Sequence, residues 1–342
     1  MSGPSSTGSA PLVRIRDLST WFHTRAGIAR AVDGVSFDIA AGQTVGLIGE
    51  SGCGKSVTAM SITGLIDRPG RIEHGSSIKF EGRELVGARE STLRAIRGNE
   101  IGMIFQEPMS SLNPVYTVGT QIAEAVRAHQ DVSQREAMDR AIEMLALVGI
   151  AVPERRTDDY PHELSGGMRQ RVMIAIALAC EPKMLIADEP TTALDVTIQA
   201  QILALLAELR ERLDMAMLLI THDLGVISQI ADHVVVMYAG RVVEQGATAA
   251  ILARPQHPYT EALLKSIPGV ATERGQPLPV IRGAVPSPYD WPAGCRFAPR
   301  CEYVFDRCIA EEPTLALVPG GLSACWLRHG QGEPKLVVSG PS

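Results

Sequence analysis

One short stretch decides the fold: GESGCGKS, residues 49–56, which follows the apolar run TVGLI and precedes the helical run VTAMSITGL. Its spacing matches the pattern Gly-x-x-x-x-Gly-Lys-Ser/Thr, and a strand before it with a helix after it is the setting in which this pattern binds phosphate. The glycines let backbone N–H groups turn toward phosphate oxygens, and the N-terminus of the next helix adds partial positive charge. The stretch predicts a phosphate-binding loop (P-loop); the alternative is a glycine-rich turn that binds nothing.

Two residues of the P-loop carry its chemistry. We expect Lys55 to neutralise the β- and γ-phosphates of ATP and the Ser56 hydroxyl to ligate Mg²⁺. The loop and the first turn after it are predicted to contact the nucleotide through Gly49, Ser51, Gly52, Cys53, Gly54, Lys55, Ser56 and Val57.

A pair of acids follows a second apolar run. MLIAD, residues 184–188, predicts a buried strand that ends at Asp188, with Glu189 next in the chain. The carboxyl ends of parallel strands are where such sheets bind ligands. Asp188 suits the coordination of a metal, and Glu189 suits the group that orients and polarises an attacking water. A surface Asp-Glu pair is the alternative.

Strands and helices alternate after the P-loop. Helical runs occupy residues 167–179 and 197–213, and apolar strand runs occupy residues 184–188 and 216–223. Such alternation predicts an α/β fold with a parallel sheet covered on both faces. Ahead of the loop, residues 12–39 predict short strands in an antiparallel meander.

A helical insertion interrupts this pattern at about residues 107–165. Its run SQREAMDRAIEMLALVGI carries apolar residues at three- and four-residue spacing and ends with a glycine. Beyond about residue 246 prolines recur, and four of the six cysteines fall within residues 295–325. We therefore divide the chain into a disordered tail (1–10), a domain that contains the P-loop (11–246) and a separate C-terminal extension (247–342).

Length and composition are those of a globular protein. The 342 residues fit about two domains, and 45% apolar with 20% charged residues argues against global disorder. A formal net charge of -6 argues against nucleic acid as a partner. The longest apolar stretch, residues 172–180, falls short of the about 18 residues needed to cross a bilayer. Residues 1–10 lack the features of a secretion signal, so we expect a cytoplasmic chain.

LSGGMRQ, residues 164–170, opens one of the predicted helices. Ser165, Gly166 and Gly167 leave unpaired N–H groups and a hydroxyl at the helix start, as in an anion site. Serine is also a common N-cap, so a plain helix cap is the alternative. The segment resembles the signature sequence of ABC ATPases, the ATP-hydrolysing parts of ABC transporters.

Three further segments resemble motifs of this family, in the family's order. Gln106 in IFQEP resembles the Q-loop, Ala-Leu-Asp at residues 193–195 the D-loop, and His222 in ITHD the switch histidine. Phe22 in LSTWF is the expected aromatic that stacks on adenine, and Trp21 lies beside it.

The resemblance implies roles for these residues. Gln106 and His222 would join Glu189 in catalysis, Gln106 would also join the Mg²⁺ ligands, and Asp195 would contact the nucleotide. Two such domains would pair head to tail, so that each signature closes over the ATP held by the other P-loop. ATP would keep the pair closed until hydrolysis releases it.

Three segments resemble the oligopeptide/dipeptide importer branch of the family, which nickel and glutathione importers share. They are QEPMSSLNP (106–114), HPYT with SIP (257–260 and 266–268), and the cysteine-rich tail. In the family the first segment begins the helical insertion that grips a coupling helix of the membrane subunit; local chemistry alone allows an ordinary turn. The resemblance covers residues 12–328.

The tail contains Cys295, Cys301, Cys308 and Cys325, without a C-x-x-C pair. Stable disulfides are not expected in a reducing cytoplasm, and metal binding supplies folding energy that a short Pro-rich segment lacks. This reasoning leaves zinc, an iron-sulfur cluster and unpaired cysteines open; the resemblance favours [4Fe-4S]. The other two cysteines, in the P-loop and in an apolar helix, are not expected to be ligands.

The expected partners follow from the resemblance. They are a second, related ABC ATPase chain in a heterodimer, two transmembrane permease subunits and an extracytoplasmic peptide-binding protein, with this chain at the cytoplasmic face of the membrane. A soluble ABC ATPase of DNA repair, translation or cluster assembly is the rival from another class, and a regulatory nucleotide sensor is a third. The sequence does not identify the peptide.

Overall fold

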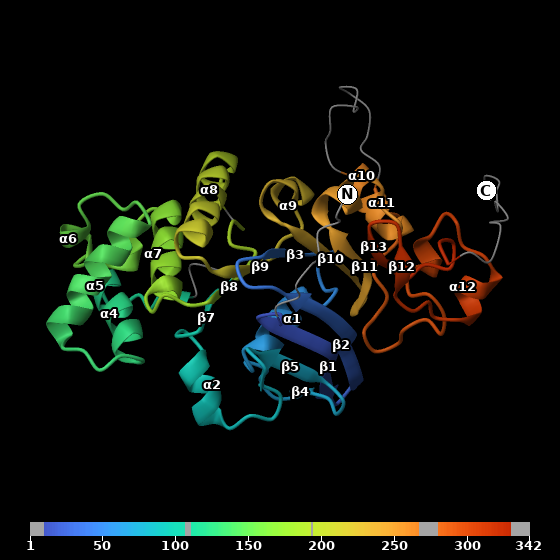
Figure 1. Ribbon diagram of the computed structural model, residues 1–342, viewed down its shortest axis with the longest axis horizontal. Coiled ribbons are helices and arrows are strands. Elements are labelled where there is room, and N and C mark those ends of the chain that lie inside the picture. The colour runs from blue at the N-terminus through green and yellow to red at the C-terminus, as the bar shows by residue number, and fades with distance from the viewer. Residues whose placement is uncertain (1–9, 107–110, 193, 267–279, 330–342) are drawn as a thin grey trace, which may run out of the picture.

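The computed structural model describes residues 10–106, 111–192, 194–266 and 280–329 (Figure 1). Two sheets organise it. The first is antiparallel, has the order β2-β1-β5-β6, and pairs β4 with β1. Its strands are β1 Val13–Thr24, β2 Gly27–Ile39, β4 Gly70–Ile72, β5 Ser77–Phe80 and β6 Arg83–Glu84.

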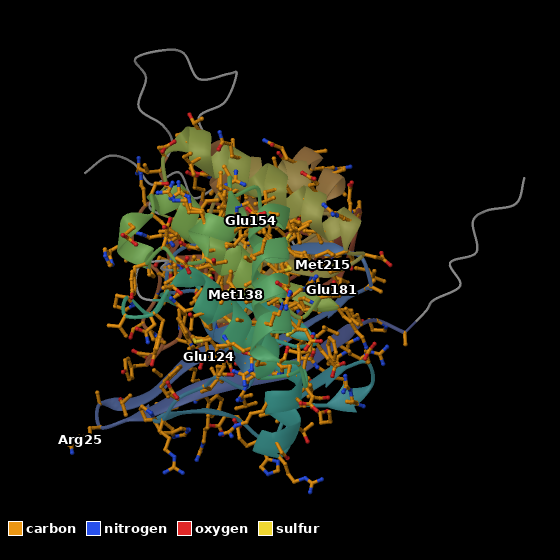
Figure 2. The ribbon with its side chains drawn as sticks, turned by 90° about the vertical axis from the view of Figure 1, so that its left-hand side faces the viewer. Arg25, Glu124, Met138, Glu154, Glu181 and Met215 are labelled. Carbon is orange, nitrogen blue, oxygen red and sulfur yellow. The ribbon has the colours of Figure 1, made fainter. Side chains whose placement is uncertain are left out.

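The antiparallel subdomain is confirmed, but its strands are not short. β1 and β2 have 12 and 13 residues and pair from Val13 opposite Ile39 to Thr24 opposite Gly27. Only two residues join them, so one long hairpin replaces the predicted meander. Its tip at Arg25 projects away from the helices in Figure 2.

The second sheet has eight strands in the order β12-β13-β11-β10-β3-β9-β8-β7. The five strands from β10 to β7 are mutually parallel, which confirms the predicted α/β class. They are β3 Thr44–Ile48, β7 Ile101–Ile104, β8 Met184–Asp188, β9 Ala216–Ile220 and β10 His233–Tyr238. The antiparallel remainder is β11 Arg241–Ala247, β12 Ala316–Val318 and β13 Gly321–Ser323.

Helices surround this sheet. Those of the nucleotide-binding part are α1 Lys55–Ile62, α2 Glu90–Ile96, α7 Gly166–Leu178, α8 Val196–Arg212 and α9 Leu224–Ile230. The helical insertion contains α4 Val118–Arg127, α5 Gln134–Leu147, α6 Pro153–Arg156 and η1 Pro161–Glu163. The C-terminal part adds α10 Thr248–Ala253, α11 Pro258–Lys265, η2 Ala298–Arg300 and α12 Asp306–Ala310.

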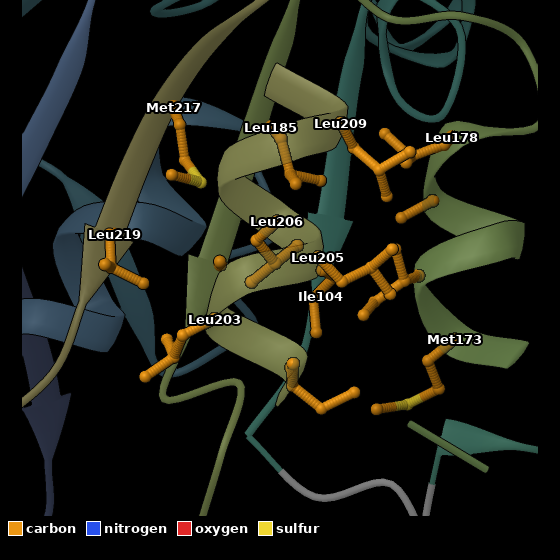
Figure 3. Close-up of a cluster of buried hydrophobic side chains, with 14 of the residues drawn as sticks. Ile104, Met173, Leu178, Leu185, Leu203, Leu205, Leu206, Leu209, Met217 and Leu219 are labelled. Atoms are coloured by element: carbon orange, nitrogen blue, oxygen red, sulfur yellow. The ribbon is translucent and has the colours of Figure 1, made fainter. Parts of the chain in front are cut away.

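The two faces of the parallel sheet belong to different cores. Alternate side chains of a strand point to opposite faces; in β8, Leu185 and Ala187 pack into the core that contains α7 and α8. Figure 3 shows Leu185 with Leu206 and Leu209 of α8 and Leu178 of α7. Met184 and Ile186 pack into the other core, with α1 and the antiparallel sheet. Helices α1 and α7 therefore cover opposite faces of the sheet.

The C-terminal extension is not a separate appendage. Its hairpin β12–β13 continues the central sheet, because β13 pairs with β11 from Gly246 opposite Gly321 to Glu244 opposite Ser323. Tyr259 and Phe297 lie in the same core as α7 and α8. Sequence composition marked a change at residue 246, but strand pairing joins both sides of that boundary.

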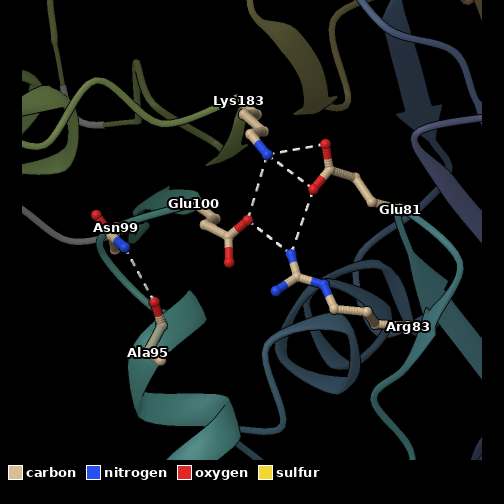
Figure 4. Close-up of polar contacts among 6 residues, drawn as sticks. All are labelled: Glu81, Arg83, Ala95, Asn99, Glu100 and Lys183. Atoms are coloured by element: carbon tan, nitrogen blue, oxygen red, sulfur yellow. Dashed lines mark hydrogen bonds and ion pairs between the residues drawn. The ribbon is translucent and has the colours of Figure 1, made fainter.

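A network of charged side chains links the two sheets at one edge (Figure 4). Lys183 Nζ lies 2.7 Å from Glu81, and Arg83 lies 2.6 Å from Glu100. Glu81 lies in the β5–β6 turn and Arg83 begins β6, whereas Lys183 and Glu100 immediately precede β8 and β7. These groups are partly exposed to solvent, so the network contributes little to stability.

Candidate nucleotide site

The P-loop joins β3 to α1. At two positions of this loop, Gly49 and Gly54, only glycine fits. A Cβ on Gly49 would lie 2.2 Å from the Met237 carbonyl oxygen, and one on Gly54 would lie 2.4 Å from that of Ala31. Gly54 also has a φ of 104°, which L side chains rarely adopt. The motif glycines are therefore dictated by close packing against β10 and β2.

Lys55 is held inside the loop, with 5% of its surface exposed. Its amine donates hydrogen bonds to the carbonyl oxygens of Gly49 at 2.8 Å and Glu50 at 3.1 Å. The first residues of α1 offer backbone N–H groups at the same place, since the first turn of a helix leaves these groups without helical partners. Positive charge and free donors are thus concentrated in one loop, as an anion site requires.

The side chains of Ser56 and Asp188 fit a magnesium ion. Asp188 ends β8, is 4% exposed, and accepts a hydrogen bond from the Ser56 hydroxyl. Burial raises the pKa of the Asp188 carboxyl, while Ser56 and Lys55 oppose that shift. The Asp188 Oδ1 atom is buried without a hydrogen-bond partner. Such an atom is costly to leave unpaired, and oxygen atoms are the ligands that Mg²⁺ prefers.

Two predicted catalytic side chains, those of Gln106 and His222, converge on the carboxylate of the third, Glu189. Gln106 Nε2 donates to Glu189 Oε2 at 3.1 Å, and His222 Nδ1 lies 3.4 Å from Glu189 Oε1. Glu189 has a φ of 45°, an unusual backbone conformation for a non-glycine residue that often marks functional sites. Thr192, which the sequence did not single out, donates to Glu189 Oε2 at 2.9 Å.

Glu189 opens onto a cleft of about 500 Å³, lined also by Thr192, Gln199 and His222. A water could reach the carboxylate there, which is the arrangement expected for a group that polarises an attacking water. A larger cavity of about 870 Å³ lies between β2, β11 and the C-terminal extension. None of the residues predicted to bind nucleotide lines it, so its size does not identify the site.

The signature serine opens α7 as predicted. Ser165 is exposed, and its hydroxyl accepts a hydrogen bond from the Met168 N–H at 3.4 Å, so it is an N-cap. Gly166 and Gly167 are the first residues of the helix. The helix that Ser165 caps and the helix that follows the P-loop pack on opposite faces of the sheet.

The other predicted nucleotide residues lie on different elements, β1 and the start of α8. Asp195 caps α8 by accepting a hydrogen bond from the Ile198 N–H at 3.0 Å, and its neighbour Ala193 lies outside the described residues. Phe22 lies on β1, half-buried, with Gly70 opposite it on β4. The Arg30 guanidinium covers the Trp21 ring at 4.9 Å, which favours Phe22 over Trp21 as the free aromatic.

Two of the importer-like segments are described only in part. Leu112 of the first is buried, and Gln121 of α4 accepts a hydrogen bond from the Asn113 N–H at 2.9 Å, while residues 107–110 lie outside the described ranges. In the second, residues 257–260 open α11, and residues 267–268 are not described.

The four cysteines of the tail line one small apolar pocket, beside His257, Phe297 and Trp326. All are free thiols, and burial raises the pKa of Cys295 and Cys325 to about 11 and that of Cys301 to about 12. Within the residues described, no group of three or more His, Cys, Asp or Glu side chains stands ready to hold a metal ion. The predicted metal site is therefore not confirmed, although its ligands share a pocket.

No helix in the described ranges combines enough length with enough apolar character to cross a bilayer.

Two protein families match the sequence. The family described as ABC transporter matches residues 32–192. The family described as oligopeptide/dipeptide transporter, C-terminal region, matches residues 243–308. The second match begins in β11 and includes α11 and three of the four pocket cysteines.

Curated relatives are similar over nearly the whole chain. The dipeptide transport ATP-binding protein DppD of Escherichia coli is 51% identical over 310 residues, which cover 91% of this chain and 94% of the relative. The oligopeptide transport ATP-binding protein AppD of Bacillus subtilis is 50% identical over 322 residues, covering 94% and 98%.

Solved structures share the fold of the nucleotide-binding part. A dimeric ATP-binding cassette in a post-hydrolysis state, bound to ADP and Pi, has a TM-score of 0.62 and 27% identity, covering 69% of this chain and 98% of that one. The protein cbiO1 of Clostridium perfringens, part of an ABC transporter complex, has a TM-score of 0.61 and 28% identity, covering 72% and 92%.

Proposed function

The chain belongs to the ABC transporter family of ATP-binding proteins, and we propose that it is the ATP-hydrolysing subunit of an importer for dipeptides or oligopeptides. The substrate class rests on sequence identity. Over more than nine tenths of its length, the chain is 50% and 51% identical to oligopeptide and dipeptide transport ATP-binding proteins. The family described as oligopeptide/dipeptide transporter, C-terminal region, matches residues 243–308, which include part of the extension. We propose residues 11–246 as the ATPase domain and 247–342 as this extension.

The proposed site uses the residues that converge in the structure. Lys55 and the N–H groups of the P-loop bind the triphosphate, and Ser56, Asp188 and Gln106 hold Mg²⁺. Glu189 would polarise the attacking water, and His222, which contacts Glu189, would assist it in catalysis. The short distances from Glu189 to Gln106 and His222 support this assignment.

A complete site requires two chains under this proposal. Ser165, Gly166 and Gly167 act on the ATP held by a partner cassette, which is consistent with the signature and the P-loop lying on opposite faces of the sheet. A solved cassette of similar fold is described as dimeric. We propose a related ATPase chain as the partner, giving a heterodimer.

The remaining proposed partners follow from peptide import. They are two permease subunits and an extracytoplasmic peptide-binding protein, with this chain bound at the cytoplasmic face of the membrane. We propose that the helical insertion around α4 contacts the permease, since Val115 and Tyr116 before α4 are large apolar residues that remain exposed.

Peptide uptake tests the substrate class. Cells that lack this subunit should fail to take up labelled dipeptides and oligopeptides, and the intact chain should restore uptake whereas the Glu189→Gln variant should not. Restored uptake of nickel or glutathione in place of peptides would assign the chain to a related importer. Failure of the intact chain to copurify with integral membrane proteins would favour a soluble ABC ATPase.

We further propose that the cysteine pocket holds a [4Fe-4S] cluster, with Cys295, Cys301, Cys308 and Cys325 as ligands. The shared apolar pocket supports this, and metal binding would displace protons that burial otherwise keeps on the thiols. When bound, such a cluster would cross-link the extension.

Metal analysis checks this prediction. Chain purified without oxygen should contain iron and sulfide in equal amounts and show broad visible absorbance. Both should be lost in Cys308→Ser but kept in Cys180→Ser, since Cys180 lies outside the pocket. Zinc in place of iron identifies the alternative metal, and the absence of both rejects a metal site.

A further inference from the structure

Two side chains of the C-terminal extension hydrogen-bond to Glu50 of the P-loop. Tyr259 of α11 accepts a hydrogen bond from the Glu50 N–H at 2.7 Å. Arg300, at the end of η2, donates two hydrogen bonds to the Glu50 carboxylate, at 2.6 and 2.9 Å. A bidentate pair of this kind fixes both the position and the orientation of the carboxylate.

Glu50 in turn holds the lysine of the P-loop. Its carbonyl oxygen accepts hydrogen bonds from Lys55 Nζ at 3.1 Å and from the Cys53 N–H at 3.3 Å. The carbonyl that positions Lys55 and the N–H that Tyr259 binds therefore belong to the same residue, Glu50. Tilting of Glu50 would move the carbonyl against which the lysine is placed.

The two side chains that contact Glu50 are held in place by other residues of the extension and of the sheet. Arg300 is 4% exposed and also donates to the Ile281 and Arg282 carbonyl oxygens, at 3.2 and 2.9 Å. The hydrogen bond with Glu50 raises the pKa of Arg300 further above its usual value, so the guanidinium remains charged. The Tyr259 ring packs 4.6 Å from that of Tyr238, between centroids.

The segment HPYT explains why Tyr259 lies there. His257 caps α11, because its Nδ1 accepts a hydrogen bond from the Tyr259 N–H at 3.0 Å. Burial lowers the pKa of His257 to about 3, so the ring is neutral and Nδ1 remains an acceptor. Glu244 of β11 accepts hydrogen bonds from the N–H groups of Gln256 and His257, at 2.6 and 3.0 Å. The sheet thus fixes the start of α11, and α11 fixes Tyr259.

The charge of Glu50 needs compensation. A carboxylate in a loop that binds a triphosphate repels its ligand, and this repulsion is strong where water is partly excluded. The Arg300 guanidinium compensates that charge and holds the carboxylate through two hydrogen bonds. The rest of the loop offers no comparable acid, since its other residues are glycine, serine, cysteine and lysine.

We propose that Arg300 and Tyr259 are positioning residues of the nucleotide site, through which the C-terminal extension fixes Glu50 and neutralises it so that the P-loop accepts ATP. The inference rests on the proposed function of the P-loop. It gives the extension a direct role in nucleotide binding in addition to any role in holding a metal.

Nucleotide affinity of the full-length chain tests this inference, with displacement of a fluorescent ATP analogue by Mg-ATP as the readout. Tyr259→Phe should weaken binding about three- to tenfold, the effect of losing one hydrogen bond. Arg300→Ala should weaken it at least as much, because it removes two hydrogen bonds to Glu50 and the compensating charge. Arg300→Lys should give a smaller loss. Adding Glu50→Gln to Arg300→Ala should restore the affinity to within about twofold of the original, because the uncompensated charge is removed.

Controls separate this effect from folding and from failure of the P-loop assignment. Arg307→Ala removes an arginine of the same extension that pairs with Glu311, and it should leave affinity unchanged. The thermal midpoint without nucleotide reports folding; if Arg300→Ala does not fold, Tyr259→Phe and Arg300→Lys carry the test. Normal affinity in these variants, or no rescue by Glu50→Gln, overturns the inference. Normal affinity in Lys55→Ala would instead overturn the proposed function.

Discussion

Glu189→Gln should reduce ATP turnover about 100- to 10,000-fold while Mg-ATP still binds, because the amide keeps the shape of the side chain but cannot accept a proton from water. The carboxylate lies between Gln106 and His222 and borders the cleft through which water reaches it. Removing the charge leaves the P-loop and its lysine unchanged. Binding and hydrolysis should therefore separate in this variant.

The same substitution should hold the chain in its ATP-bound pair. If hydrolysis opens the pair, a variant that binds ATP without cleaving it accumulates the closed state. Turnover is measured on the transporter complex that contains this subunit, and pairing with the partner cassette by size-exclusion chromatography in Mg-ATP. Glu181→Gln provides the matched control, since Glu181 is an exposed acid just before β8 that pairs with Arg140. Undiminished hydrolysis in Glu189→Gln would reject Glu189 as the catalytic group.

Local chemistry was enough to predict the elements that form the nucleotide site. The run MLIAD predicts a strand at residues 184–188, and β8 has those bounds because five consecutive buried residues fit a strand covered on both faces. The P-loop was predictable for a related reason. Its glycines are needed where a Cβ would collide with neighbouring backbone, and its lysine must follow at the start of a helix.

Contacts between distant parts of the chain were not predictable in this way. Glu50 and Tyr259 are 209 positions apart, and no local pattern indicates that a phenol binds a P-loop N–H. The pairing of β13 with β11 could not be predicted either, because three-residue strands carry little hydrophobic periodicity. Thr192 was missed for a smaller reason: its spacing of three from Glu189 was a usable signal, but the turn that brings the two together was not expected.

That α1 and α7 cover opposite faces of the sheet could not be predicted from the sequence. This placement also limits how one chain can use its P-loop and its signature. The motifs lie in the family's order along the chain, but order does not state which face of the sheet each helix covers. Alternation within β8 supplies that information, since neighbouring residues of this strand enter different cores. This placement supports the proposal that the signature of one chain acts on nucleotide held by another.

Lys55→Ala should weaken Mg-ATP binding by the isolated full-length chain about 10- to 100-fold, the range expected for losing a hydrogen bond to a charged group. The amine is buried in the loop and is placed by the carbonyl oxygens of Gly49 and Glu50, so alanine removes the charge without disturbing the glycines. Lys183→Ala is the matched control, because Lys183 belongs to the surface network of Figure 4. The thermal midpoint should rise with added Mg-ATP in the original chain and in Lys183→Ala, but much less in Lys55→Ala. Equal shifts in all three would mean that the nucleotide is held elsewhere.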